Sequence, residues 1–264
     1  MKRNHLPSGF RRAAFFLREY LFPFGCPICG RGLVDTLESW YGLCGDCRAG
    51  MDLDLGESLA RKTCLRCGRP LVSESGSCLS CRRFRETPGG IAPAPDRVRV
   101  LFPYMGKYRN LLSAYKFGGN LALGNFLAEK VLDLLGRGAF PPDAVSPGAS
   151  LVPVPPRPGR TRATGWDQVE YLARLLEGKR VGDSPQGLRV SRCLRRLPSK
   201  SQKGLGRENR MTNLRGRIVP LSRAPETALV IDDVRTTGST LAACAAALRE
   251  GGARTVFGLC LFYD

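Results

Sequence analysis

Four Cys-x-x-Cys pairs lie close together in the first third of this 264-residue chain, and they constrain its fold more than any other feature. Each pair presents two thiolates to one metal ion, and two pairs complete a tetrahedral site of the kind that zinc occupies. Because the spacing is regular and no secretory signal is recognised, metal sites are favoured over disulfide bridges. The sequence therefore predicts two structural zinc ions, bound by Cys26, Cys29, Cys44, Cys47, Cys64, Cys67, Cys78 and Cys81.

The order of the pairs favours a ribbon arrangement, in which the first two pairs share one ion and the last two share the other. The spacing also leaves a crossed pairing open. Gly30 and Gly68 each follow a pair directly, where a tight turn needs a residue that tolerates positive φ. Few apolar residues surround the pairs, so zinc is predicted to supply most of the folding free energy, on the order of 10 kcal/mol per ion. We expect chelation to unfold residues 20–85 and to spare the rest.

The length of the chain suits one ordinary core plus a smaller module. A Pro- and Gly-rich stretch predicts a domain boundary near residue 90. The expected units are an N-terminal amphipathic helix (1–22), a double zinc ribbon (23–88) and an α/β domain (89–264). The basic first unit is expected to pack onto its own domain, with a partner or a membrane surface as the alternative. Since no run approaches the roughly 18 apolar residues of a membrane span, no transmembrane segment and a cytoplasmic location are expected.

Positive charge is concentrated in one part of the chain. The formal net charge is +18, and residues 157–217 contain sixteen Lys or Arg against five Asp or Glu. Such a field attracts polyanions, namely nucleic acid, anionic lipid or phosphorylated metabolites, while the alternative is a solvated basic surface. His5 is the only histidine, so catalysis by a Ser-His-Asp or Cys-His arrangement is excluded from the body of the protein.

Helical and strand patterns alternate after the predicted boundary, which indicates an α/β fold with a largely parallel sheet. Ligands of such sheets bind beyond the carboxyl ends of the strands. Three further cysteines, Cys193, Cys244 and Cys260, lie in apolar patterns and are expected to be buried and unreactive. The expected strands are 98–104, 150–154, 188–194, 228–231 and 255–262, and the expected helices are 108–117, 121–135, 166–176 and 239–250.

One stretch, VIDDVRTTGST (230–240), combines two acids with a run of hydroxyls at the end of an expected strand. Its loop leads into a helix, whose N-terminal amides and hydroxyls suit a phosphate dianion. Asp232 and Asp233 would repel phosphate but suit sugar hydroxyls or a magnesium ion. The alternative is a helix cap without a ligand. Acids for vicinal hydroxyls beside a phosphate site together describe a ribose 5-phosphate.

The same stretch resembles the phosphoribosyl-pyrophosphate motif of type I phosphoribosyltransferases, and the whole chain resembles the ComF family of competence-associated proteins. The resemblance rests on LFPFGCPICG, LLSAYKFGG, LVPVPPRPGR, GWDQVEYLA and the late basic segment with Gln202, Arg207 and Asn209 or Asn213. It implies a phosphoribosyltransferase-like α/β domain after the zinc ribbon. The family usually shows a basic residue, Gly, an aromatic residue, Asn and Gln where this chain has residues 164–168, so no phosphate-binding role is assigned there.

The resemblance also implies the roles of individual residues. The catalytic pair would be Asp232 and Asp233, holding the ribose hydroxyls of a phosphoribosyl pyrophosphate bound with magnesium. The 5-phosphate would lie on Arg235, Thr236, Thr237, Gly238, Ser239 and Thr240. The turn 152–157, with a strained peptide, and a lid at 200–210 would face the pyrophosphate through Val154, Pro155, Arg157, Arg160, Arg162, Lys200, Lys203 and Arg207.

Two functions remain open from the sequence. One is a magnesium-dependent phosphoribosyltransferase, which displaces pyrophosphate from C1 of the ribose with an unidentified acceptor. The other is a non-catalytic protein that binds single-stranded DNA and uses the pocket as a sensor or as part of a polynucleotide site. Both are consistent with a phosphoribosylated small molecule as ligand and, by the resemblance, with the DNA-uptake machinery at the inner face of the membrane as partner.

Overall fold

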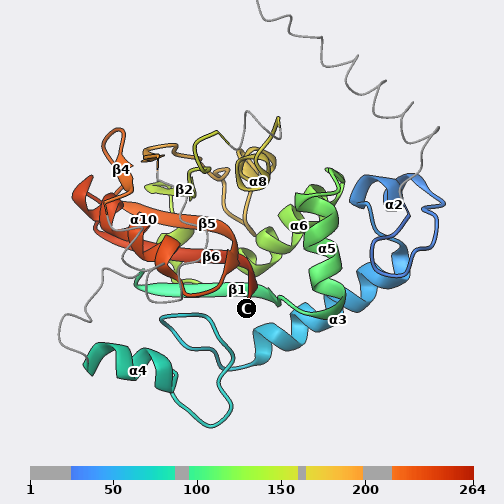
Figure 1. Ribbon diagram of the computed structural model, residues 1–264, viewed down its shortest axis with the longest axis horizontal. Helices are drawn as coiled ribbons and strands as arrows, with labels where there is room; N and C mark the ends of the chain where they lie inside the picture. The colour runs from blue at the N-terminus through green and yellow to red at the C-terminus, as the bar shows by residue number, and fades with distance from the viewer. Residues whose placement is uncertain (1–24, 87–94, 160–164, 199–215) are drawn as a thin grey trace, which may run out of the picture.

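A four-stranded parallel sheet forms the centre of the computed structural model, which describes residues 25–86, 95–159, 165–198 and 216–264 (Figure 1). The strand order is β1-β6-β5-β2. Most residues of these strands are apolar and buried, as expected where both faces of a parallel sheet are covered. Their bounds are β1 (Arg97–Pro103), β2 (Ala149–Pro153), β5 (Thr227–Arg235) and β6 (Thr255–Tyr263).

Helices cover both faces of the sheet. Alternate strand residues point to opposite faces: Leu229 and Ile231 join the core formed with α6 and α8, whereas Ala228 and Val230 join the core formed with α10. A two-stranded antiparallel sheet, β3 with β4, lies on the α10 side. The bounds are α5 (Gly106–Lys116), α6 (Leu123–Gly136), η1 (Pro142–Val145), α8 (Gln168–Leu176), β3 (Leu194–Arg196), β4 (Ile218–Pro220) and α10 (Ser239–Glu250).

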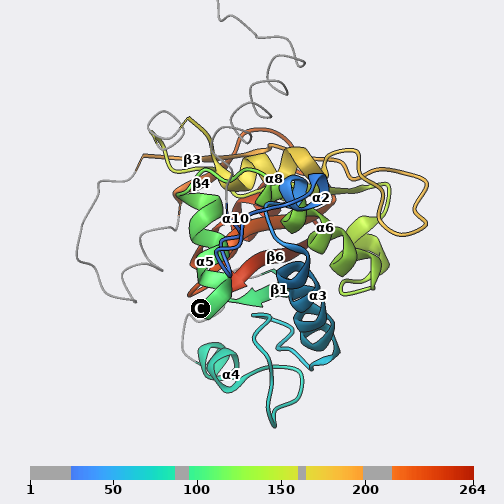
Figure 2. The ribbon, with the colours of Figure 1, turned by 90° about the vertical axis from the view of Figure 1, so that its right-hand side faces the viewer.

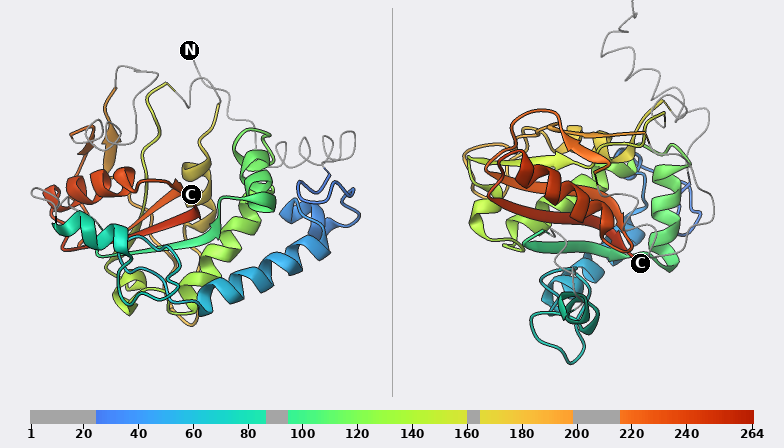
Figure 3. Two further views of the ribbon diagram at one scale, coloured as in Figure 1. Left: turned by 60° about the horizontal axis from the view of Figure 1, so that its bottom comes forward. Right: turned by 60° about the vertical axis from the view of Figure 1, so that its left-hand side comes forward.

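The cysteine-rich region contributes the helices α2 (Thr36–Tyr41), α3 (Gly45–Ala60) and α4 (Leu79–Glu86). Its first half is not a separate unit, because Met51 and Leu55 of α3 are buried in the same core as the sheet. Figure 2 and the right panel of Figure 3 show the segment from the end of α3 to α4 projecting from the α/β domain on the side of β1. The two halves of the region therefore relate differently to the rest of the protein.

Most elements expected from the sequence are present, and the α/β class with a parallel sheet is confirmed. The helix 239–250 has the predicted bounds, and β5-α10-β6 is the predicted unit of two parallel strands joined by a helix. The strand predicted at 188–194 is wrong: Val190 makes a single bridge to Leu151, and β3 begins only at Leu194. No helix in the described part of the chain has the length and apolar character needed to cross a membrane.

Candidate functional site

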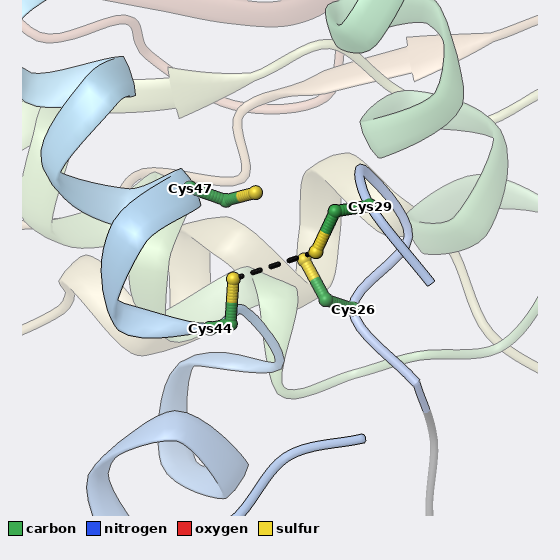
Figure 4. A group of neighbouring side chains, drawn as sticks. All are labelled: Cys26, Cys29, Cys44 and Cys47. Atoms are coloured by element: carbon green, nitrogen blue, oxygen red, sulfur yellow. Dashed lines mark hydrogen bonds between the residues drawn. The ribbon is translucent and has the colours of Figure 1, made fainter. Parts of the chain in front are cut away.

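The first cysteine site consists of Cys26, Cys29, Cys44 and Cys47, whose sulfurs gather between a turn after Gly25 and the start of α3 (Figure 4). Cys26 and Cys44 are buried in the main core. The turn is closed by a hydrogen bond from the Gly30 N–H to the Cys26 carbonyl (2.8 Å), and Gly30 has φ 78°. The predicted need for positive φ after this pair is confirmed.

The second cysteine site, Cys64, Cys67, Cys78 and Cys81, repeats this local geometry. The Gly68 N–H donates to the Cys64 carbonyl (2.7 Å), and Gly68 has φ 72°. The ribbon pairing is therefore the one present, not the crossed pairing. The buried cysteines of the second site form a small hydrophobic cluster of their own, against which Leu71 and Cys81 pack.

The sulfur spacing in both sites fits zinc. Tetrahedral zinc with Zn–S bonds of about 2.3 Å places its sulfurs about 3.8 Å apart. The distance between the sulfurs of Cys29 and Cys44 is 3.6 Å, and that between Cys67 and Cys78 is 3.7 Å. All four sulfurs of each site lie within 4.8 Å of one another. The chain therefore holds two closed four-cysteine sites, the geometry of structural zinc.

The acid pair lies inside β5, not after it, because β6 pairs with β5 up to Arg235. On the other side β2 ends at Pro153, opposite Ile231. Asp232 and Asp233 are therefore the first residues of β5 that extend past the end of β2. As neighbours in a strand they point to opposite faces of the sheet, and both are buried.

Asp233 faces the helices α5 and α8. Its Oδ2 forms an ion pair with Lys116 Nζ at the end of α5 and accepts a hydrogen bond from Gln168 Nε2 at the start of α8 (2.7 Å). The Val234 N–H donates to Oδ1 (2.7 Å). Burial alone would raise the pKa of Asp233, but Lys116, Gln168 and the Val234 N–H together lower it below its usual range. Asp233 is therefore held as a carboxylate in the folded protein.

Asp232 faces the opposite side of the sheet and has a different environment. Its Oδ1 accepts a hydrogen bond from the Asp233 N–H (2.9 Å). Burial and the negative charge of Asp233 raise the pKa of Asp232 well above its usual range. The pKa values of the two carboxyl groups are thus shifted in opposite directions, which favours the charged form of Asp233 and the protonated form of Asp232. Such opposite shifts are common where a site must both accept and donate hydrogen bonds.

The segment that we call the loop 235–240 runs from the last residue of β5 through a short turn into the first two residues of α10. Gly238 precedes the helix with φ 79°, a conformation that other residues rarely adopt. A Cβ there would also lie 3.4 Å from Nε of Arg235, so the guanidinium covers this glycine. The hydroxyls of Thr237 and Ser239 are 2.9 Å apart. Arg235 and the two hydroxyls therefore lie together at the start of α10, with Thr236 in the same turn and Thr240 as the second residue of the helix.

The residues predicted to face a pyrophosphate are only partly described. Val154 and Pro155 are buried after β2, where the Val154 N–H donates to the Ile231 carbonyl (3.0 Å), and Arg157 is exposed. The described residues contain no cis peptide bond and no non-glycine residue with positive φ, so neither form of strain is found in this turn. Arg160, Arg162, Lys200, Lys203, Arg207 and the N-terminal segment 1–22 lie outside the described residues.

Asp167, which replaces an uncharged residue of the family pattern, has a structural role. It is the N-cap of α8, and its Oδ1 accepts hydrogen bonds from the N–H groups of Val169 and Glu170 (3.0 Å each). The cap places Gln168 in the first turn, beside Asp233. The added negative charge is therefore used locally, at the positive end of a helix.

Three residues near the acids had no role assigned from the sequence. Lys116 and Gln168 lie in two of the stretches that carry the resemblance, and that position was the only signal available. Arg196 of β3 is half-buried and near Asp232: burial and the positive charge of Arg157 lower the pKa of its guanidinium, and Asp232 acts in the opposite direction. Arg196 therefore lies within electrostatic reach of both Asp232 and Arg157.

Comparison with known proteins supports two predictions made from the sequence, the double zinc ribbon and the resemblance to competence-associated proteins. A double zinc ribbon domain family matches residues 17–82, which include both cysteine sites. The chain is similar to the competence protein ComFC of Streptococcus pneumoniae, with 24% identity over 215 residues, or 81% of this chain and 84% of that protein. It is also similar to competence protein F of Haemophilus influenzae, with 25% identity over 240 residues, or 89% and 95% of the two chains. The predicted resemblance to ComF proteins is confirmed over most of the chain.

Proposed function

We propose that this ComF-like protein binds a ribose 5-phosphate group, as part of phosphoribosyl pyrophosphate, at the carboxyl ends of β2 and β5. The observation that carries the proposal is the direct succession of a buried acid pair and a hydroxyl-lined helix start within nine residues, 232–240. Because the similar proteins are named for competence, we further propose that the ligand serves DNA uptake, in the cytoplasm and at the inner face of the membrane.

The acids would recognise the sugar. Asp233, kept charged by Lys116 and Gln168, can accept hydrogen bonds from two vicinal hydroxyls. Asp232, whose pKa is raised by burial and by Asp233, would lie next to the same sugar from the other face of the sheet. A ligand that approaches Asp233 must share it with Lys116, so Lys116 is expected to contact the ligand as well.

The loop 235–240 would bind the phosphate. The first backbone N–H groups of a helix and nearby hydroxyls are natural ligands of a dianion. Gly238 allows close approach of the backbone, and Arg235 adds a positive charge directly above it. Thr237 and Ser239, which now bond to one another, would each turn a hydroxyl to the phosphate.

Transfer chemistry would use the far side of the sugar. The bond from C1 to the pyrophosphate oxygen breaks, the acceptor bonds to C1, and the pyrophosphate leaves with the electron pair. Arg196 is within electrostatic reach of Asp232 and of Arg157, so these two guanidinium groups would suit the leaving anion. Magnesium, when bound with the ligand, would neutralise further charge on the pyrophosphate.

Calorimetric titration with phosphoribosyl pyrophosphate and magnesium tests the binding. Wild type is expected to bind, and the double variant Asp232→Asn/Asp233→Asn about 100-fold more weakly, because two hydrogen-bonding carboxyl groups are replaced. Asp143→Asn is the matched control, since Asp143 is exposed on η1, before the start of β2. Absence of binding by wild type, or equal binding by the double variant, would contradict the proposal.

Release of pyrophosphate tests the chemistry separately. If the protein is a transferase, pyrophosphate appears when an amine or base acceptor is supplied, and Asp233→Ala abolishes it. Binding without release under any acceptor would favour a sensor that binds the ligand and makes no bond.

Binding of single-stranded DNA is the second candidate function. It is favoured by the net charge of +18 and by the concentration of Lys and Arg in residues 157–217. Fluorescence anisotropy with a labelled oligonucleotide is expected to show an affinity that falls steeply as salt rises, because phosphate contacts release counterions. Undetectable or salt-insensitive binding would rule out this candidate.

A further inference from the structure

The helix α2 carries exposed apolar side chains beside the first cysteine site. Leu37 and Trp40 are three residues apart, so they lie on one face of the helix, and Val34 directly precedes its N-cap. Val34 is 79% exposed, Leu37 49% and Trp40 55%. We call these three residues the α2 patch. Exposed apolar side chains that gather in this way, rather than singly, mark a contact surface.

The other side of α2 is fixed to the α/β domain. Tyr41 donates a hydrogen bond to Glu129 of α6, and Asn125 of the same helix donates to the Trp40 carbonyl (2.9 Å). Figure 1 shows α2 at one end of the molecule, with α5 and α6 between it and the sheet. The α2 patch is thus held in place by contacts on the side away from it.

The described part of the chain begins next to this patch. Gly25 forms an antiparallel bridge with Gly32. In an antiparallel pair, the chain before one residue runs along the chain after its partner. The residues before Gly25 are therefore directed along residues 33–34, toward α2. Residues 17–24 can span about 26 Å when extended, whereas α2, with six residues, is about 9 Å long, so they can reach the whole patch.

The sequence before Gly25 is complementary to this surface. The spacing of Phe16, Leu17, Tyr20 and Leu21 places their side chains on one face of a helix. Residues 1–24 contain five Lys or Arg and one acid, whereas residues 32–47 contain three acids and no Lys or Arg. The double zinc ribbon match begins at residue 17, so these residues belong to the zinc ribbon domain.

We propose that residues 13–22 dock on the α2 patch, with the apolar face of residues 16–21 against it. The occupant of the patch is thus a segment of the same chain, and the basic residues of that segment face the acids around α2. Docking uses the apolar face, which is then not free to enter a membrane surface or to bind another protein. The proposal is independent of the ligand of the loop 235–240.

Fluorescence of Trp40 tests the docking in the full chain. The chain has two tryptophans, so Trp166→Phe leaves Trp40 as the only one. In this background we expect a blue-shifted emission and weak quenching by acrylamide, because the docked segment covers the indole. The further change Leu17→Ser/Leu21→Ser should shift the emission to the red and strengthen the quenching. Identical emission and quenching with and without this change would overturn the proposal.

The matched control changes two apolar residues of the same segment. Phe15 and Phe22 lie outside the face formed by residues 16–21, so Phe15→Ser/Phe22→Ser should leave the fluorescence of Trp40 unchanged. An equal red shift in the control and in Leu17→Ser/Leu21→Ser would show that this face is not the one that docks, and would overturn the proposal as well.

The second arm changes the receiving surface. Val34→Ser/Leu37→Ser should speed chymotrypsin cleavage after Phe16 and Tyr20 about tenfold, because cleavage follows the population of the undocked segment. Mass spectrometry locates the cuts. Cleavage at the wild-type rate in this variant would overturn the proposal.

The control for this arm lies in the second half of the cysteine-rich region. Val72 is 99% exposed and Leu79 55%, so Val72→Ser/Leu79→Ser removes the same types of side chain from a different surface. It should leave cleavage at the wild-type rate. Since all four residues are exposed, both variants should stay folded, which circular dichroism checks.

Two further outcomes would overturn the proposal by assigning the α2 patch another occupant. Protection of Trp40 that rises with protein concentration, together with a dimer in sedimentation, would show that a second copy covers the patch. Protection that arises only when vesicles of anionic lipid are added would show that a membrane surface covers it. The proposal requires protection in the monomer without lipid.

Discussion

The two zinc sites share a local geometry and differ in what surrounds them. In both, a Cys-x-x-Cys turn ends in a glycine with positive φ, and the glycine N–H donates to the carbonyl of the first cysteine. The first site is embedded in the main core with Leu43, Met51 and Leu55, whereas the second has a cluster of its own. A metal site can thus be part of a large domain or an attachment to it, and the spacing of its cysteines does not reveal which.

Polar contacts strengthen the attachment of the first site. Lys130 of α6 is almost fully buried and bonds to Asp52 of α3 (2.6 Å), as well as to Glu129 and Asp133 of its own helix. Burial would lower the pKa of Lys130, but the three carboxylates raise it above its usual value, so it stays charged. Tyr41 donates to Glu129 from α2. The expectation that chelation unfolds residues 20–85 alone is therefore revised. Loss of zinc from the first site should also destabilise the sheet.

Loss of a ligand should separate the sites most clearly. Cys44→Ser is expected to lower the stability of the whole protein by several kcal/mol, because it removes zinc from a site inside the main core. Cys67→Ser should leave the main transition within about 1 kcal/mol and open only the second site. Calorimetric melting of the two variants measures the difference. Equal shifts of the main transition in the two variants would show that the two sites do not differ in their attachment to the main core.

Truncation of an apolar side chain near each site tests the difference between their surroundings without removing a zinc ligand. Met51→Ala removes a fully buried side chain from the shared core and should cost about 2 to 5 kcal/mol. Leu71→Ala, in the cluster of the second site, should cost less than about 1 kcal/mol, since Leu71 is only partly buried. Urea unfolding followed by circular dichroism gives both values, and a larger loss for Leu71→Ala would contradict the assignment of cores.

A smaller effect, on the rate of zinc release, is expected from substitution of Glu38, whose carboxylate bonds to residues next to the first site. Its carboxylate accepts hydrogen bonds from the Val34 N–H (2.9 Å) and the Gly45 N–H (2.7 Å) and pairs with Arg31. Glu38→Gln should speed zinc release from the first site about tenfold, whereas Glu74→Gln should change the second site less, because Glu74 accepts one bond, from the Leu79 N–H (3.1 Å). Release is followed with a chromogenic chelator.

The pH dependence of that variant has a definite sign. The Val34 and Gly45 N–H groups, with Arg31, lower the pKa of Glu38 below its usual value. The contribution of Glu38 is therefore complete above the ordinary carboxyl pKa and is lost as the pH falls through the lowered one. The ratio of release rates, Glu38→Gln over wild type, should be constant near neutral pH and approach one in acid. A ratio that is largest in acid would show that the carboxylate is not the cause.

The parts of the structure that follow from neighbouring residues could be predicted from the sequence. The zinc turns depend on residues within a few positions, so their spacing and Gly30 and Gly68 were sufficient. The unit β5-α10-β6 has long apolar runs and clear end signals, and its helix was predicted without error. The opposite orientation of Asp232 and Asp233 follows from strand alternation alone once β5 is known to continue past Ile231.

Contacts between distant parts of the chain could not be predicted in the same way. Lys116 and Gln168 reach Asp233 from 117 and 65 residues away, and only the packing of α5 and α8 brings them together. The strand predicted at 188–194 failed because its apolar residues do not form a ladder: Cys193 and Leu194 pack on the α10 core instead. Nor could the sharing of a core between α3 and the sheet be inferred from the cysteine spacing.

The Val98 N–H of β1 donates a hydrogen bond to the carbonyl of Leu65, in the Cys64–Cys67 turn of the second cysteine site (2.9 Å). β1 is one of the two edge strands of the sheet, and an edge strand exposes unpaired backbone groups on which a strand of another molecule can add. The turn of the second site covers part of this row. We therefore expect zinc loss at the second site to leave the protein folded but prone to aggregation. The metal would prevent self-association by keeping this turn on the edge of β1.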